Sequence, residues 1–275
     1  MHVDTYLKRI GYEGSPRVDV ATMFDLHRHH LEAIPYENID VQLERLVDLD
    51  IGRIYDKIVN DWRGGWCYEM NGIFGWALGE IGFDVTRMGG AVGREFSGKD
   101  NFFGSHLILD VKIDGETWLC DVGFGDAFHQ PIRLVEGPFE QRGFVFELVR
   151  DDRYWRVRNH VFGGSPSYDF VHEPVDETLL QVTCDWLRTA PESPFTGWLV
   201  VQRFVADGFQ IQQGLTAKHI TPGGVTEHSI ESADELVERL RSVFGLDVPE
   251  VADLWPRLWA KHADFVAERA ARRPN

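Results

Sequence analysis

Apolar residues recur at helical spacing through the first part of the chain. Such stripes occupy residues 20–34 and 51–59, and a third runs from about residue 66 to residue 81, just before Gly82. A repeat near 3.6 residues places apolar side chains on one face of a helix, and a glycine commonly follows the last helical turn. The first part of the chain is therefore predicted to be a small bundle of helices.

From residue 85 onward apolar and polar residues alternate, which is typical of strands. Residues 105–113 and 116–122 show this alternation, and two further pairs of alternating segments follow. The loops of the three predicted hairpins are centred on Asp114-Gly115, Asp151-Asp152 and Asp207-Gly208. Successive hairpins predict an antiparallel sheet or a small barrel in the middle of the chain.

The last part of the chain returns to helical spacing. Ser232 and Glu235 form a capping box ahead of an apolar stripe that ends before Gly245, and the final segment is also helical in pattern. The order of helices, then hairpins, then a mixture of both predicts an α+β protein.

Composition and charge narrow the classes of function. The 275 residues include 28 Lys and Arg and 44 Asp and Glu, for a formal net charge of −16. Nucleic acids and anionic membranes bind clustered positive charge, so neither is expected as a main partner. No apolar run approaches the roughly 20 residues of a membrane span, and the first residues lack the layout of a signal peptide. With only three cysteines, we expect a cytoplasmic protein with reduced thiols.

Cys67 differs from the other two cysteines in its position. Gly64 and Gly65 precede it, and a helix is predicted to begin beside it. Unpaired backbone N–H groups and the positive end of the helix dipole stabilise an anion in the first turn, which favours a thiolate and lowers the thiol pKa. The alternative is a buried cysteine that packs as a small apolar side chain.

The first predicted hairpin supplies partners for such a thiol. A two-residue loop pairs Ile113 with Glu116 and places His106 and Asp121 on one face as diagonal neighbours. Cys120 falls on the opposite, apolar face and is expected to pack. Taken singly, His106 could be a core histidine and Asp121 a strand-end residue. Together with a thiol at a helix start they predict a Cys-His-Asp triad, in which the carboxylate orients the imidazole and the imidazole exchanges the proton.

Several segments resemble the arylamine N-acetyltransferases, in the order that the family has them. They are residues 6–12 (YLKRIGY), 34–38 (IPYEN), 63–69 (RGGWCYE), 105–107 (SHL), 121–125 (DVGFG) and 193–195 (SPF). The resemblance implies a helical bundle that carries the nucleophile (residues 1–84), an antiparallel β-barrel that carries the other two triad members (85–190) and an α/β lid (191–275). It also implies that the triad is similar to that of papain-like enzymes.

The resemblance further implies a ping-pong reaction. Acetyl-coenzyme A would acylate Cys67, coenzyme A would leave, and an arylamine, arylhydrazine or N-hydroxyarylamine would take the acetyl group. The residues carried over from the family are Cys67, His106 and Asp121 as the triad, Gly123 and Phe124 in the acceptor pocket, and Ser105, Tyr68 and Phe204 as further substrate-binding residues. Backbone N–H groups near Cys67 and Tyr68 are the expected oxyanion donors.

The residues that hold coenzyme A do not form a recognisable motif. The chain has no phosphate-binding loop of the G-x-x-x-x-G-K-S/T type. Lys99, Arg203, Lys218 and His219 are candidates for its phosphates, with a plain surface charge as the alternative for each.

Two other charged features have less specific interpretations. Residues 27–30 (HRHH) are not expected to bind a metal, because successive helical residues point in different directions, so we expect a half-solvated helix face there and no metal site. Arg63 and Glu37 are either a buried ion pair that braces the cysteine turn or two surface charges.

Other functions remain open from the residues alone. A cysteine hydrolase or peptidase would use the same triad with water as acceptor, and an amide synthase would close a polyketide chain, as some relatives do. A binding module would give no reason for the three side chains to coincide. Met70, and the glycine-rich charged segment at residues 93–104, depart from the family and leave the acceptor open. Whether the chain forms a homo-oligomer is also open.

Overall fold

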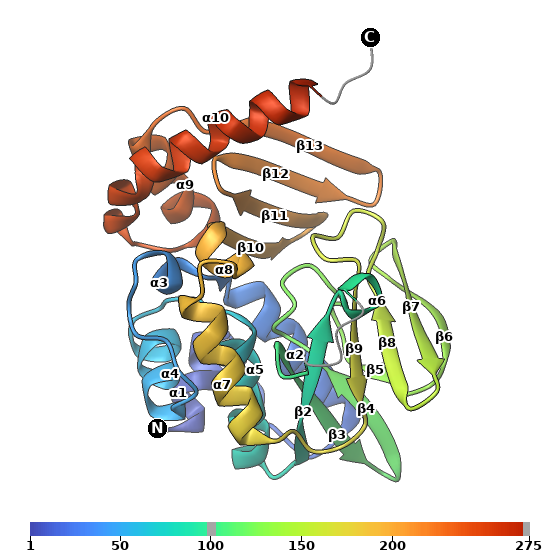
Figure 1. Cartoon of the computed structure of the whole chain (residues 1–275). Helices are drawn as coiled ribbons and strands as arrows, with labels where there is room; N and C mark the ends of the chain where they lie inside the picture. The colour runs from blue at the N-terminus through green and yellow to red at the C-terminus, as the bar shows by residue number, and fades with distance from the viewer. Residues whose placement is uncertain (98–102, 272–275) are drawn as a thin grey trace.

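The computed structural model describes residues 1–97 and 103–271. Figure 1 shows the first helices on one side of the molecule, a larger curled sheet beside them, and a smaller sheet with the last helices above both. The chain mixes helices and antiparallel sheets, as predicted. Within the described ranges, every helix is too short or too polar to span a lipid bilayer.

The helices predicted for the first part of the chain are present. They are α1 (Val3–Arg9), α2 (Val20–Ala33), α3 (Ile39–Gln42), α4 (Ile51–Tyr55) and α5 (Cys67–Ile81), with a π-helical turn at Asp56–Asn60. Helix α2 begins after Asp19, whose side chain accepts a hydrogen bond from the backbone N–H of Thr22. Helix α5 ends at Gly82, where φ is 109°, a backbone conformation that favours glycine. Apolar side chains of α1, α2 and α5 share one core with the larger sheet.

The larger sheet has eight strands in the order β5-β4-β3-β2-β9-β8-β7-β6. Their bounds are β2 (Asp84–Val92), β3 (His106–Ile113), β4 (Glu116–Cys120), β5 (Ile132–Arg133), β6 (Gly137–Gln141), β7 (Phe144–Asp151), β8 (Tyr154–Arg158) and β9 (Ser167–Val171), with the short helix α6 (Arg94–Ser97) after β2. The sheet curls into a half-barrel, so the prediction of a barrel is only partly correct. Strands β5 and β6 are its edges, and a closed barrel would need them to pair.

The first hairpin has the predicted register. Ile113 pairs with Glu116, and the two loop residues have φ values of 53° (Asp114) and 79° (Gly115), as a tight turn of this kind requires. The other two loops lie one residue away from their predicted centres, because Asp151 pairs with Tyr154 and Val205 pairs with Gly208.

Gly208 shows why the third loop is shifted. It belongs to a strand rather than to the turn, and a Cβ atom there would lie 1.9 Å from the backbone oxygen of Ile220 on the neighbouring strand. At this position glycine therefore allows the two strands to approach each other closely. The turn is formed by Ala206 and Asp207.

The smaller sheet has the order β1-β10-β11-β12-β13. Its strands are β1 (Tyr36–Glu37), β10 (Val200–Val205), β11 (Gly208–Gln213), β12 (Thr216–Thr221) and β13 (Gly224–Ser229). Around it lie α8 (Pro194–Gly197), α9 (Ala233–Phe244), a 3₁₀ turn (Pro249–Leu254) and α10 (Trp255–Ala271). Strand β1 comes from the first part of the chain, so this sheet joins residues that are far apart in sequence. Ser232 caps α9 by accepting from the backbone N–H of Glu235, and α9 ends at Gly245, both as predicted. The predicted capping box is only half present, because the Glu235 carboxylate accepts from the backbone N–H of Glu231 instead of that of Ser232.

Helix α7 (Glu177–Thr189) was not predicted. It lies in the region expected to be barrel, and Figure 1 shows it crossing the front of the molecule beside α5. Its buried side chains, Leu180, Cys184 and Leu187, share a small core with Cys67.

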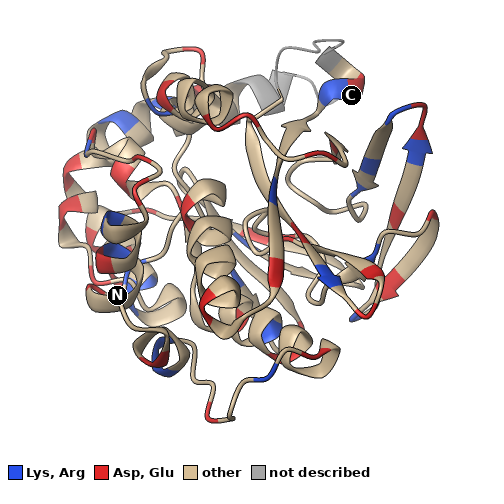
Figure 2. Ribbon diagram, turned by 90° about the horizontal axis from the view of Figure 1, so that it is seen from below, with Lys and Arg blue, Asp and Glu red and all other residues tan. Residues whose placement is uncertain are grey.

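Acidic and basic positions are interspersed along the helices and strands seen in Figure 2. Because acidic residues outnumber basic ones by 44 to 28, the chain as a whole does not attract an anionic ligand. An anionic ligand must therefore be held by local donors.

Candidate active site

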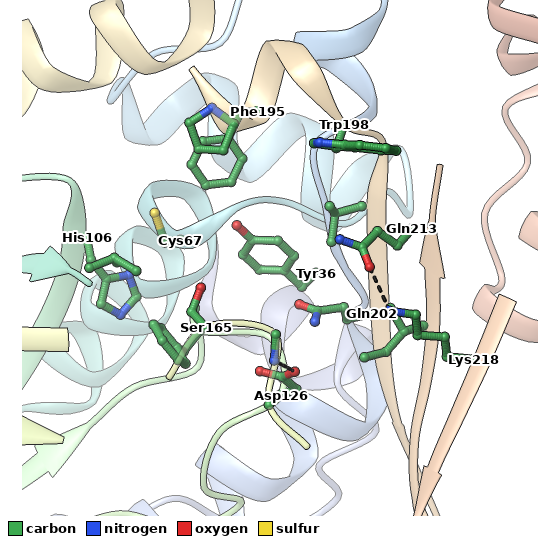
Figure 3. A pocket seen from close by; sticks show the side chains of 18 of the residues that line it. Tyr36, Cys67, His106, Asp126, Ser165, Phe195, Trp198, Gln202, Gln213 and Lys218 are labelled. Carbon is green, nitrogen blue, oxygen red and sulfur yellow. Dashed lines mark hydrogen bonds between the residues drawn. The ribbon is translucent and has the colours of Figure 1, made fainter. Parts of the chain in front are cut away.

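A cavity of about 520 Å³ lies where α5, the larger sheet and the smaller sheet meet. Cys67, His106 and Phe124 line one part of it, while Gln202 and Lys218 of the smaller sheet line another. Figure 3 shows Cys67 and His106 at the same end of the cavity and Lys218 at the other. The cavity thus brings residues from all three parts of the chain together.

Cys67 is the first residue of α5, as predicted. The backbone before it passes very close to another segment, since a Cβ on Gly64 would lie 2.1 Å from the backbone oxygen of Pro35. The backbone N–H of Trp66 donates to Glu69 Oε2 at 3.2 Å, which satisfies one of the unpaired donors at the helix start. These contacts place the sulfur at the cavity wall.

A cluster of buried charges braces this turn. Arg63 Nη2 lies 2.8 Å from Glu37 Oε1, and Glu37 is fully buried, so the two form a buried ion pair rather than two surface charges. Lys57 Nζ lies 2.8 Å from Asp40 Oδ2 and 2.9 Å from Glu69 Oε2. Burial raises the pKa of Glu69 to about 7, although Lys57 opposes the rise.

His106 and Asp121 meet directly. His106 Nε2 lies 2.8 Å from Asp121 Oδ2, and both side chains are buried. Burial opposes ionisation of the carboxyl group, but the neighbouring His106, with hydrogen bonds from His106, Asn71 and the backbone N–H of Gly123, holds the pKa of Asp121 below its usual value. Since the carboxylate accepts from Nε2, the Nδ1 atom of His106 takes no part in this contact.

Asn71 is a supporting residue that the sequence analysis missed. Its Nδ2 donates to Asp121 Oδ1 at 2.8 Å and to the backbone oxygen of Leu107 at 2.6 Å, and its Oδ1 accepts from the backbone N–H of Val122 at 2.9 Å. It lies four residues after Cys67 on α5, hence on the same helix face. That spacing was the signal that could have identified it.

His27 supports Asp121 from behind. The backbone N–H of Asp121 donates to His27 Nε2 at 3.2 Å, and His27 Nδ1 donates to the backbone oxygen of His129 at 3.0 Å. These partners require a neutral imidazole, and burial lowers the pKa of His27 to about 4. The expectation of a half-solvated face at residues 27–30 is wrong for His27 and His30, which are both fully buried with their rings against Phe74 of α5.

The thiol itself is protonated more firmly than its helix position predicted. Burial raises the pKa of Cys67 well above its ordinary value, and hydrogen bonds from the backbone of Leu107 and Tyr68 only partly oppose this. The Sγ atom lies 3.9 Å from the backbone oxygen of Ser105. Desolvation therefore outweighs the helix terminus at this position, and an unaided thiolate is disfavoured.

The structure places the predicted substrate-binding residues in two groups. Ser105, Gly123 and Phe124 line the cavity. The hydroxyl of Tyr68 instead donates to the backbone oxygen of Gly104 at 2.6 Å, away from the described cavity lining. Phe204 packs against Phe209, with ring centroids 4.6 Å apart, beyond the part of β10 that reaches the cavity.

Gly123 is required by close packing. A Cβ atom there would lie 2.8 Å from the Cα of Cys67 and 2.6 Å from Asn71 Nδ2. A side chain at this position would therefore push the segment after Asp121 away from the start of α5.

The four candidates for binding the coenzyme phosphates also divide into a residue that lines the cavity and residues that do not. Lys218 lines the cavity, and its Nζ donates to Gln213 Oε1 at 2.8 Å. Arg203 donates to the backbone oxygens of Val243 and Glu32 at 3.2 and 3.3 Å. His219 Nε2 lies 3.0 Å from Asp207 Oδ1, and Lys99 lies outside the described residues.

No group of three or more His, Cys, Asp or Glu side chains that could hold a metal gathers anywhere in residues 1–97 and 103–271. The histidines of α2 have separate partners instead. His29 Nδ1 lies 3.1 Å from the backbone oxygen of Ile10, and His30 Nδ1 lies 2.8 Å from the hydroxyl of Tyr6.

Comparison with known proteins identifies relatives of the chain. A sequence model of a family described as N-acetyltransferase matches residues 19–253, which places the chain among the N-acetyltransferases. The arylamine N-acetyltransferase of Mycolicibacterium smegmatis is 33% identical over 92% of this chain and 94% of its own length. Human arylamine N-acetyltransferase 1 is 29% identical over 96% of this chain and 98% of its own.

Solved structures show the same relationship. The M. smegmatis arylamine N-acetyltransferase has a TM-score of 0.84 and 31% identity, with 94% of this chain and 97% of that chain covered. The Mycobacterium marinum arylamine N-acetyltransferase in complex with CoA has a TM-score of 0.83 and 28% identity, with 91% and 94% covered. The chain belongs to the arylamine N-acetyltransferase family, as the sequence motifs indicated, and it is an acetyltransferase enzyme.

Proposed function

We propose that this enzyme transfers an acetyl group from acetyl-coenzyme A to the nitrogen of an arylamine, arylhydrazine or N-hydroxyarylamine through an acetyl thioester on Cys67. The observation that carries the proposal is that Cys67 and His106 line one cavity while His106 Nε2 lies 2.8 Å from Asp121 Oδ2. In this proposal the nucleophile and the base line the cavity, the carboxylate contacts the base, and each of the three comes from a different segment.

The first half-reaction follows from the state of the thiol. Because burial raises the pKa of Cys67, we assign His106 Nδ1 to take the thiol proton as the sulfur attacks the acetyl carbonyl. The carbonyl electrons move to the oxygen, which the backbone N–H groups near Cys67 and Tyr68 stabilise. When the carbonyl re-forms, the bond to the coenzyme sulfur breaks, and His106 returns the proton to that leaving thiolate. Cys67 is left as an acetyl thioester.

The second half-reaction repeats these steps with nitrogen as the nucleophile. Aromatic amines are weak bases and stay unprotonated near neutral pH, so the lone pair is free to attack the acetyl-Cys67 carbonyl. His106 takes the proton that the nitrogen loses and gives it to the Cys67 sulfur as that bond breaks. The amide product is more stable than a thioester, so this step runs downhill. The aryl ring would pack against Phe124, whose ring lies 5.3 Å from that of His106.

In this proposal each of the three regions of the chain has its own role. Residues 1–84 carry the nucleophile, residues 85–190 carry His106 and Asp121, and residues 191–275 close the cavity as a lid. Among the described residues that line the cavity, Lys218 is the lysine or arginine. We therefore assign it to bind an anionic group of coenzyme A. The M. marinum relative in complex with CoA supports binding of this co-substrate.

Mass spectrometry after exposure to acetyl-coenzyme A alone tests the proposal. We expect one acetyl group on Cys67, release of about one coenzyme A thiol per site, and then a stall until an arylamine is added. Cys67→Ala should abolish both the label and transfer, whereas Cys184→Ala, which removes a neighbouring buried thiol, should keep both. Continuous thiol release without an amine would instead identify a hydrolase and contradict the proposal.

A further inference from the structure

One carboxylate of the cavity has no role in the triad. Asp126 is the acidic side chain among the described residues that line the cavity, and it is 1% exposed, like His106. Its Oδ2 accepts a hydrogen bond from the backbone N–H of Gly164 at 2.7 Å, and its Oδ1 accepts one from Asn159 Nδ2 at 3.2 Å. Each carboxylate oxygen has a second lone pair, so Asp126 can take further donors from a ligand.

The charge on Asp126 lacks a partner of opposite sign at contact distance. The side chains and backbone groups that donate to it are uncharged, and the opposite charge that acts on it among the described residues is Lys218, which forms no ion pair with it. Burial raises the pKa of Asp126 to about 6, opposed by its hydrogen bonds and more weakly by Lys218. Above that pH a buried negative charge therefore borders the cavity, and a cation or N–H donor on a ligand would compensate it.

The position of Asp126 relates it to the acceptor rather than to the reacting atoms. It follows the 121–125 segment, whose Phe124 lines the same cavity. Figure 3 shows Asp126 beside Gln202, across the cavity from Cys67 and His106. An aromatic amine with its nitrogen at Cys67 and its ring against Phe124 would direct the opposite end of the ring toward Asp126.

We infer that Asp126 selects the acceptor: it favours aromatic amines that carry a second, cationic N–H donor on the ring and disfavours those that carry an anionic group. This inference rests on the proposed acetyl transfer to arylamines and names the class of acceptor within it. A carboxylate and an amidinium form a paired, charge-assisted hydrogen bond, whereas two carboxylates repel each other.

Two other roles are compatible with parts of the geometry. The sole role of Asp126 could be to hold the segment at residues 159–165 through Asn159 and Gly164. Substitution of Asp126 would then lower activity equally with every acceptor. Lys218, the cation of the same cavity, could instead favour anionic acceptors, in which case substitution of Lys218 would change the preference and substitution of Asp126 would not.

Three acceptors of nearly identical shape separate these roles. 4-Aminobenzamidine is cationic, 4-aminobenzamide is neutral and 4-aminobenzoate is anionic at pH 7.5. We would measure kcat/KM for each with the full-length enzyme at saturating acetyl-coenzyme A, in the parent, Asp126→Asn and Lys218→Gln. Asparagine keeps the shape of the side chain and an oxygen for Gly164. The neutral acceptor reports any loss of fold or of general activity.

The expected result is a parent that prefers the amidine to the benzoate and an Asp126→Asn variant in which this ratio falls by about tenfold or more. An equal loss for all three acceptors, or a ratio that changes only in Lys218→Gln, would overturn the assignment. If Asp126→Asn fails to fold, the parent enzyme provides a second test. Its kcat/KM ratio of the amidine to the amide should fall between pH 7.5 and pH 5, because Asp126 becomes protonated over that range. A constant ratio would overturn it.

Failure of this inference is distinguishable from failure of the proposed function. Acetyl transfer to all three amines with an unchanged ratio rejects the role of Asp126 and leaves the transferase. Transfer from an acetylated Cys67 to none of them, and to neither an arylhydrazine nor an N-hydroxyarylamine, rejects both.

Discussion

Replacement of His27 tests how strongly the buried support of Asp121 depends on pH. His27 is fully buried, donates to the backbone oxygen of His129 and accepts from the backbone N–H of Asp121. Protonation would put a charge in the core and remove the acceptor that Asp121 uses. The unfolded chain protonates this imidazole near pH 6.5, whereas burial lowers its pKa in the folded protein to about 4.

The sign and size of the effect follow from these two values. Between pH 6.5 and 4 the unfolded chain binds the extra proton, so the contribution of His27 to stability is complete above pH 6.5 and is lost as the pH falls toward 4. A difference of about 2.5 pKa units, at 1.36 kcal/mol per unit, corresponds to about 3 kcal/mol over that range. Most of this should be lost by pH 4.5.

Urea unfolding followed by tryptophan fluorescence, at several pH values from 7 to 4.5, measures the effect in the parent and in His27→Gln. Glutamine does not titrate but can still accept from Asp121, and the packing lost against Phe74 and Phe128 should lower stability by a constant amount at every pH. His129 and His160 also titrate near pH 4, and they are common to both proteins. The variant should therefore lose about 3 kcal/mol less than the parent on acidification. Parallel profiles would refute the reasoning.

Three further substitutions have expected outcomes. Asp121→Asn should lower kcat/KM about a thousandfold or more, since it removes the group that orients His106; a loss below tenfold in steady-state assays would contradict this. Asn71→Leu leaves the backbone groups of Leu107 and Val122 without partners and should lower the free energy of unfolding by about 2–4 kcal/mol in urea, with an unchanged midpoint as the contrary result. Gly64→Ala places a Cβ 2.1 Å from the oxygen of Pro35 and should lower the melting temperature by several degrees, whereas Gly79→Ala, which meets nothing within 4 Å, should not.

The relation between His106 and Asp121 could be predicted because it depends on one hairpin. Asp114 and Gly115 adopt the positive φ values of a two-residue loop, and this sets the pairing of every residue between them and the strand ends. The helix start at Cys67 was predictable for the same reason, since local glycines and the stripe that follows define it. Short-range patterns thus located all three members of the proposed triad.

The ionisation of the thiol could not be predicted in this way. A helix start lowers a thiol pKa, but the amount of water around Cys67 depends on what covers it, and α7 was not recognised in the sequence. Leu180 and Cys184 of that helix pack in the same core as Cys67. Burial by segments far away in the sequence therefore opposes the effect of the helix start on the thiol pKa.

By itself the sequence determined the family, the order of most helices and hairpins, and the residue types that carry the proposed chemistry, because these depend on neighbours within a few residues. Only the tertiary structure decided what surrounds them: the support of Asp121 by His27 and Asn71, the placement of Phe204 away from the cavity, and the presence of Asp126 and Lys218 in its wall. These contacts join segments separated by many residues. They exist only once α5 and the two sheets have packed together, so no local pattern encodes them.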